Sequence, residues 1–136
     1  MKKAALVCSL GMLVFTLSCG HPMTLLSITV SPTTQTVTGS GSALANFPTK
    51  FTAYGNFIHP KEMVDISNQV TWTTSVPLVA TVDSSGHVSA TGNGSCGTVL
   101  VTATANKGLV GPGTSDVIVT GTATFIVNDT SNPNCK

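Results

Sequence analysis

The stretch from Gln69 to Ala90 restricts the fold of this chain more than any other part of the sequence. Between residues 69 and 73 apolar and polar side chains alternate, and Val70 and Trp72 share one phase. This period of two is typical of a strand with one buried face. Pro77 has no amide hydrogen to give to a neighbouring strand, so it belongs at a sheet edge or in a turn. The first part of the stretch therefore predicts a strand that ends at a corner.

A hairpin is predicted directly after this corner. Residues 78–82 form a second apolar, β-branched run, and Val88 and Ala90 continue as a third short strand. Between these runs, Asp83 can close an Asx turn, and Gly86 permits a positive φ angle. A strand, a corner and a hairpin in so short a span are typical of an all-β domain. No periodic helix of useful length is present in the sequence.

The composition favours strands and excludes one class of partner. Charged residues make up only 8% of the 136 residues, and threonine, serine, valine and glycine dominate, as expected for one domain of short strands and tight turns. The formal net charge is +1, and it becomes −1 without Lys2 and Lys3, because four lysines then face five acids. A chain without a basic patch lacks the electrostatic attraction that nucleic-acid binding needs. We therefore expect no nucleic-acid partner.

Five segments, in their order and approximate spacing, resemble the bacterial Ig-like group 2 domain, a module that also occurs in intimin and invasin-type adhesins. The matching segments are 28–32 (ITVSP), 50–55 (KFTAYG), 65–75 (DISNQVTWTTS), 79–86 (VATVDSSG) and 97–104 (GTVLVTAT). The resemblance covers roughly residues 25–128 and implies an all-β, Ig-like β-sandwich of two antiparallel sheets with about seven strands. A longer Gly/Pro-rich link at 106–116 and the cysteines Cys96 and Cys135 depart from the family pattern.

The first 18 residues are predicted to be an export signal. Lys2 and Lys3 form its positive n-region, and residues 4–17 form an apolar h-region that is too short to span a bilayer comfortably. The expected parts of the chain are a signal peptide at 1–18, a tether at 19–24, the Ig-like domain at 25–128 and a polar C-terminal tail at 129–136.

The end of this signal, Thr16-Leu-Ser-Cys19-Gly20, resembles a bacterial lipobox, although Thr16 stands where leucine is commoner. In such proteins the cysteine is lipidated and becomes the mature N-terminus, and two or more acyl chains anchor a domain far better than one. We therefore expect a lipid on Cys19 that holds the chain to the cell envelope, at the outer membrane or the cell surface. The alternative is ordinary signal-peptidase cleavage, which would leave Cys19 as a free thiol in a secreted protein.

Two cysteines remain after Cys8 leaves with the signal and Cys19 takes the lipid. Cys96 and Cys135 are an even pair in an oxidising compartment, which predicts a disulfide. The bridge would tie the C-terminal tail to the loop before a strand expected at residues 97–105. Two unpaired thiols are the alternative.

Alternation also predicts which residues of the other strands point inward. In the first strand these are Leu26, Ile28 and Val30, and in the second Phe51, Ala53, Gly55 and Phe57. In the last two strands they are Val99, Val101 and Ala103, then Val117, Val119, Ala123, Phe125 and Val127. Trp72 and three of the phenylalanines, Phe51, Phe57 and Phe125, are the expected centre of the core. Gly121 predicts a bulge or bend in the last strand.

Two groups of residues resemble chemical motifs by letter only. Gly92-x-Gly94-x-x-Gly97 has the spacing of a dinucleotide fingerprint, but a strand pattern follows it instead of the helix whose N-terminus would hold the pyrophosphate. Asp83, Ser84, Ser85 and His87 include the residue types of a hydrolytic triad. Neighbours on one turn cannot easily reach triad geometry, so a plain turn is the better interpretation and no catalytic residue is expected.

No metal or cofactor is expected either. The histidines at 21, 59 and 87 lack the spacing of zinc ligands. The aspartates at 65, 83, 116 and 129 could contribute to a Ca²⁺ site at one end of a sandwich, but no dense loop of oxygen ligands accompanies them.

Two loops are the expected contact surfaces for a partner, because such folds bind mostly through loops or a sheet edge. Residues 56–65 and 106–116 contain side chains too apolar to be purely solvated: Phe57, Ile58, Met63, Leu109 and Val110. Local packing of these side chains is the alternative. The function expected is a non-enzymatic envelope lipoprotein whose Ig-like domain binds a protein or a glycan. A purely structural envelope protein without a specific ligand is the alternative.

Overall fold

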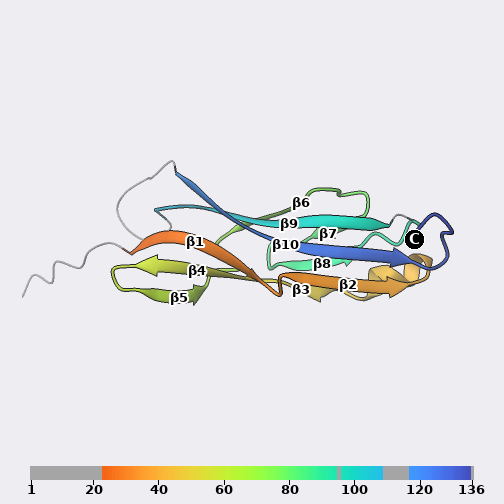
Figure 1. Cartoon of the computed structure of the whole chain (residues 1–136), viewed down its shortest axis with the longest axis horizontal. Helices are drawn as coiled ribbons and strands as arrows, with labels where there is room; N and C mark the ends of the chain where they lie inside the picture. The colour runs from red at the N-terminus through yellow and green to blue at the C-terminus, as the bar shows by residue number, and fades with distance from the viewer. Residues whose placement is uncertain (1–22, 95, 109–116, 136) are drawn as a thin grey trace, which may run out of the picture.

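The computed structural model describes residues 23–94, 96–108 and 117–135, and these residues form strands almost throughout (Figure 1). The elements in chain order are β1 (Thr24–Ser31), β2 (Thr34–Gly39), the short 3-10 helix η1 (Gly41–Asn46), β3 (Thr49–Lys50), β4 (Thr52–Ile58), β5 (Glu62–Asp65), β6 (Thr71–Thr74), β7 (Ala80–Val82), β8 (His87–Ala90), β9 (Gly97–Asn106) and β10 (Ile118–Asp129). No helix among these residues is long and apolar enough to cross a membrane.

One layer of the molecule is built on the long pair β9 and β10. These two strands pair antiparallel from Ile118 opposite Asn106 to Val127 opposite Gly97. β6 pairs antiparallel with the other side of β9, and β2 lies on the other side of β10, which gives the order β2-β10-β9-β6.

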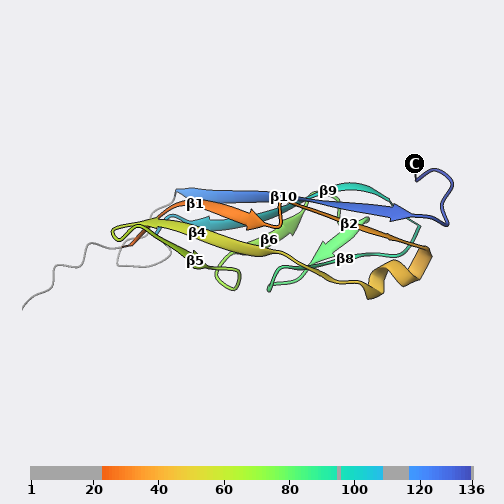
Figure 2. The same cartoon turned by 60° about the horizontal axis from the view of Figure 1, so that its bottom comes forward.

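The second layer combines two groups of strands, β1-β4-β5 and β3-β8-β7. Phe51 alone separates β3 from β4, and its N–H donates to the carbonyl of Gly86 at 2.8 Å. Residues 49–58 are therefore one nearly continuous strand that belongs to both groups. Figure 2 shows β4, β5 and β8 on one side of β9 and β10. The all-β, Ig-like sandwich is thus confirmed, and the described residues form ten strands instead of about seven partly because long strands are interrupted.

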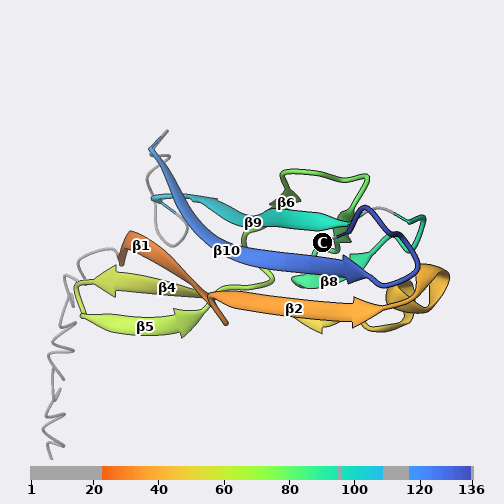
Figure 3. The ribbon, with the colours of Figure 1, turned by 45° about the vertical axis from the view of Figure 1, so that its right-hand side comes forward.

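The pair of β2 and β10 is parallel, whereas two antiparallel sheets were expected. Pairing of β1 with β4 ends at Ser31, and Pro32, which follows, has no amide hydrogen to continue it. Only residues 32 and 33 separate β1 from β2. The chain therefore keeps its direction as it passes from one layer to the other, and β2 arrives beside β10 pointing the same way (Figure 3).

The core lies between the layers and contains the four aromatic residues expected there. Phe51, Phe57, Trp72 and Phe125 are all buried. The rings of Phe51 and Phe125 meet edge to face, with centroids 6.3 Å apart and planes at 78°. This geometry is favoured by the ring quadrupoles, and it joins the two layers directly.

Trp72 is fixed by a polar network that is buried except for the exposed Asp65. Its indole Nε1 donates to the carbonyl of Ser67 at 2.9 Å. The Ser67 hydroxyl donates to Asp65 Oδ1 at 2.6 Å and accepts the N–H of Ala53 at 2.9 Å. Each of these polar groups has a partner, as buried polar groups require, so the network sets the position of β6 relative to β4.

Leu26 and Val117 were expected to point inward, but both are exposed. Leu26 is exposed and Leu25 is buried instead, because the register of β1 against β4 shifts between Leu25 and Ser27. Gly121 was expected to mark a bulge or a bend, and β10 pairs with β9 without a register shift through Gly121, so the bulge does not occur. A Cβ atom at Gly121 would lie 2.5 Å from the carbonyl oxygen of Ile28. The glycine is needed because β1 and β10 approach closely.

Candidate functional site

The first candidate site lies at the end of the sandwich where β1 begins and β4 ends, which we call the tip. The residues 56–65, expected to be a loop, are mostly a hairpin of β4 and β5, in which Asn56 pairs with Met63 and Phe57 with Glu62. Burial alternates along β4 with Phe57 on the inner face. Because directly paired residues share a face, Met63 and Asn56 point outward.

A groove of about 300 Å³ opens at the tip, and we call it the tip groove. Its apolar lining comes from Leu26, Phe57, Ile58 and Met63, and Lys61 and Glu62 lie at its rim. Leu26 is 59% exposed and Met63 is 64% exposed, and Leu26 reaches the groove because of the register shift in β1. Contacts between strands remote in sequence create this groove, so the sequence offered no signal for Leu26.

The residues expected to contact a partner therefore differ in burial and location. Phe57 is only 3% exposed, as its expected place in the core predicted, and it also lines the tip groove. Ile58 is half-buried and Met63 is exposed, and both line the tip groove. Leu109, Val110 and Cys19, the residue expected to carry a lipid, lie outside the described residues.

A second groove, of about 310 Å³, runs along the edges of β6 and β7, and we call it the edge groove. Trp72, Thr74 and Pro77 are among its lining residues. In the connection between the two strands, Val76 and Leu78 are 38% and 74% exposed. Leu78 had been placed in a strand by its apolar run, and the neighbouring Pro77 was the signal that this segment lies at a corner.

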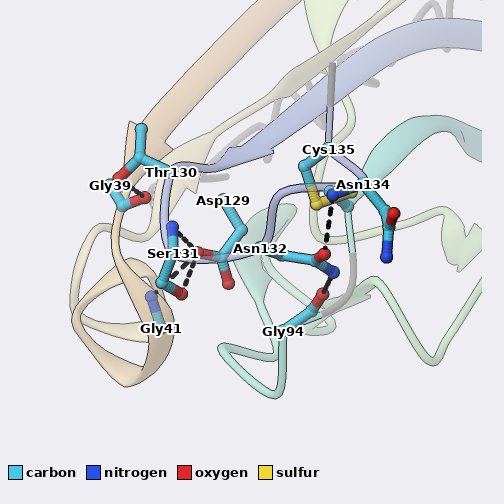
Figure 4. Close-up of a disulfide and its surroundings, with 10 residues drawn as sticks. Gly39, Gly41, Gly94, Asp129, Thr130, Ser131, Asn132, Asn134 and Cys135 are labelled. Atoms are coloured by element: carbon cyan, nitrogen blue, oxygen red, sulfur yellow. Dashed lines mark hydrogen bonds between the residues drawn. A yellow bond between two sulfur atoms is a disulfide. The ribbon is translucent and has the colours of Figure 1, made fainter.

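The opposite end of the sandwich is closed by a disulfide (Figure 4). Cys96 and Cys135 are bonded, with Cα atoms 5.7 Å apart, which confirms the expected pairing. The tail that follows β10 is also held by hydrogen bonds: Asn132 Nδ2 donates to the carbonyl of Gly94 at 2.6 Å, and the N–H of Thr130 donates to Gly39 at 2.7 Å. The tail is therefore tied to both layers.

Asp129 was expected to begin a polar tail, but it is part of the sandwich. It is the last residue of β10 and only 1% exposed. Its Oδ1 accepts hydrogen bonds from the Ser131 hydroxyl at 2.6 Å, the Ser131 N–H at 2.9 Å and the Gly41 N–H at 3.1 Å. These donors, the Ser131 hydroxyl most strongly, hold the pKa of Asp129 below its ordinary value. The spacing Asp-x-Ser, which also occurs at Asp83, was the available sequence signal.

The low pKa of Asp129 makes its contribution to stability depend on pH. A carboxyl whose pKa is lower in the folded state contributes stability that is complete above its unfolded pKa, about 3.9, and is lost as the pH falls through the folded pKa. We expect Asp129→Asn to lower the free energy of unfolding at pH 7, and the gap to the wild type to shrink as the pH falls below about 4. Urea unfolding at a series of pH values measures this gap, and Ser131→Ala should reproduce part of it. A gap that stays constant down to pH 2.5 would contradict the assignment.

The residues that resembled a hydrolytic triad form one plain turn around Asp83. Asp83 Oδ1 accepts the N–H groups of Ser85 at 2.8 Å and His87 at 2.9 Å, and Oδ2 lies 3.1 Å from the His87 ring in an exposed pair. This is the Asx turn that the sequence predicted. Asp65 and Asp129 close similar turns elsewhere, and Asp116 lies outside the described residues. Within the part of the chain that the structure describes, no three His, Cys, Asp or Glu residues are grouped so that they could hold a metal ion.

Comparison with known proteins adds one finding. The family model of the intimin immunoglobulin-like domain matches residues 68–107, a span that contains β6, β7, β8 and β9 with Trp72 and the Asp83 turn. A search of curated proteins found no match. The matched segment lies within the all-β, Ig-like sandwich, so this part of the chain is similar to the intimin immunoglobulin-like domain.

Proposed function

We propose that this chain is a non-enzymatic, lipid-anchored protein of the bacterial cell envelope whose Ig-like domain binds a protein or a glycan at the cell surface. The observation that carries the proposal is the match to the intimin immunoglobulin-like domain over residues 68–107. It covers four consecutive strands of the sandwich, and it favours a surface module of the adhesin type.

The lipid anchor rests on the sequence before the domain. A positive n-region and a short apolar h-region lead to Cys19. β1 begins only five residues later, at Thr24, so an acylated Cys19 would hold the domain close to the membrane.

The edge groove is the surface that we assign to a partner. It lies on the side of the sandwich, at the edges of β6 and β7, and not at the end where the tether joins. Exposed Leu78 and Val76 beside it supply apolar contact area, and an exposed strand edge can pair with an extended segment of another chain.

A structural spacer without a specific ligand is a second candidate. The position of the tip groove favours it, because this groove lies where the described chain begins and a large partner has the least room there. The two functions predict the same anchor and differ in adhesion.

The test is to express Cys19→Ser in cells, with Cys8→Ser as the matched control. Cys8 belongs to the predicted signal peptide, so its replacement should leave the mature protein unchanged. We expect wild type and Cys8→Ser to remain in the membrane fraction and to make cells adhere to immobilised matrix proteins or glycans. Cys19→Ser should lose both properties. Membrane location without any adhesion would favour the spacer, and equal membrane location of all three proteins would contradict the lipid anchor.

A further inference from the structure

We propose that the tip groove seats the domain on the lipid bilayer that holds the acylated Cys19, with Leu26, Ile58 and Met63 at the membrane–water interface. This inference rests on the proposed lipid anchor. It adds the face of the domain that touches the membrane, and therefore the orientation in which the domain is held.

The first reason is distance. Thr24, at the start of β1, pairs with Ile58 at the end of β4, so the tether joins the domain beside the groove. Cys19 precedes Met23 by four residues, and four residues span at most about 14 Å in a fully extended chain. An acylated Cys19 therefore keeps the tip within about 14 Å of the bilayer surface.

The second reason is the concentration of exposed apolar side chains at the tip. Among the described residues eight large hydrophobic side chains are exposed, and four of them belong to this end: Leu26, Met63, Val117 and Ile118. Val117 lies near β1 because Lys107 links the two. The N–H of Leu25 donates to the carbonyl of Lys107 at 3.3 Å, and the N–H of Lys107 donates to the carbonyl of Val117 at 2.8 Å. Figure 1 shows the starts of β1 and β10 at the same end of the molecule, away from the C-terminus.

The third reason is charge. Lys61 lies at the rim of the groove, and Lys107 adjoins β1 on its other side, while Glu62 is the acid at the rim. Lysine can lay its aliphatic stem along an apolar surface and keep its ammonium group in water. Anionic headgroups attract such lysines near the membrane surface. Two lysines beside an apolar floor therefore suit a bilayer.

The groove fits a lipid surface better than a glycan or a protein. Glycan recognition needs several polar groups that point to the ligand, but the Asn56 amide is already engaged, donating to Ser27 Oγ at 3.1 Å and Thr29 Oγ1 at 3.2 Å. A folded protein partner would have to enter a gap no wider than about 14 Å. The contact itself can be weak, because the anchor makes it intramolecular and gives it a high effective concentration.

The experiment measures the depth of the tip in a membrane. Met63→Cys in the full lipidated protein introduces one free thiol, since Cys19 would carry lipid and Cys96 is bonded to Cys135. A nitroxide spin label on this thiol is studied in vesicles of phosphatidylethanolamine and phosphatidylglycerol. Collision with oxygen, which concentrates in the bilayer, is compared with collision with a water-soluble nickel complex. Ala45→Cys is the matched control, because Ala45 is an exposed residue of η1 near the opposite end of the molecule (Figure 1).

We expect the ratio of oxygen to nickel collisions at position 63 to be at least threefold higher than at position 45. Leu26→Ser in the Met63→Cys protein should lower the ratio toward that of the control. Equal ratios at positions 63 and 45, in protein whose mass shows lipid on Cys19, would overturn the inference and leave the anchor intact. Protein without lipid on Cys19 would overturn both.

Discussion

Replacing Cys96 and Cys135 by serine is expected to lower the free energy of unfolding by about 4 kcal/mol. The bridge joins residues separated by 39 positions in the sequence, and loss of this cross-link lets the unfolded chain explore many more conformations. It also frees the tail after β10, whose Asn132 bonds to the loop before β9 and whose Ser131 bonds to Asp129 at the end of β10. A loss of this size is a large share of the stability of a small domain, which is usually about 5–15 kcal/mol.

Urea unfolding of oxidised wild type, reduced wild type and the double variant measures this effect. Reduction should bring the wild type to the stability of the double variant, whereas the variant should not respond to reductant. A double variant within about 1 kcal/mol of the oxidised wild type would show that the bridge closes a tail that the rest of the fold already holds.

Gly86→Ala is expected to destabilise the domain by about 2 kcal/mol more than Gly94→Ala. The two glycines have nearly the same positive φ angle, 84° and 81°. A side chain at either position costs about 1–2 kcal/mol for the left-handed conformation. They differ in their surroundings. A Cβ at Gly86 would lie 2.5 Å from the carbonyl oxygen of Phe51 and 2.8 Å from Trp72 Cζ2, whereas a Cβ at Gly94 would meet no atom within 4 Å.

The difference between the variants therefore isolates the packing of the Asp83 turn against the core. Phe51 is the residue that joins β3 to β4, and its N–H donates to the carbonyl of the same Gly86. Movement of this turn would disturb both the layer and the indole of Trp72. Chemical denaturation, followed by the fluorescence of this single tryptophan, gives both free energies. Equal losses for Gly86→Ala and Gly94→Ala would contradict the close packing.

Local sequence chemistry was sufficient for the centre of the fold. The Asp83 turn, the buried face of Trp72 and the inward side chains of β9 follow from alternation and turn residues that lie next to one another in the chain. These signals depend little on the rest of the molecule. They also lie within residues 68–107, the part of the chain that is similar to the intimin immunoglobulin-like domain.

Features that depend on contacts between remote segments could not be predicted in the same way. Alternation placed Leu26 inside, but the register shift against β4 exposes it and buries Leu25. Gly121 was expected to mark a bulge or a bend, but alternation gave no sign that the close approach of Ile28, from a strand far away in the sequence, requires a glycine there.

The candidate sites show the same limit. Met63 was predicted to be an apolar contact residue of a binding loop, and it lines the tip groove. Its neighbour Leu26 comes from β1 and was not among the expected contact residues. The edge groove forms because β6 and β7 lie side by side, and no local sequence pattern predicts how close these two strands are. Asp129 looked like part of a polar tail, because its burial depends on Gly41 and the disulfide-bonded end of the chain.

The most direct test of a lipid-anchored, disulfide-closed Ig-like module is the intact mass of the protein purified from a bacterial membrane fraction, measured with and without reduction. The predicted mass corresponds to a chain that begins at Cys19 and carries a diacylglyceryl-type adduct, and it rises by two hydrogens when the bond between Cys96 and Cys135 is reduced. A soluble species without lipid would contradict the anchor and make the protein a secreted module. A mass that does not change on reduction would contradict the disulfide.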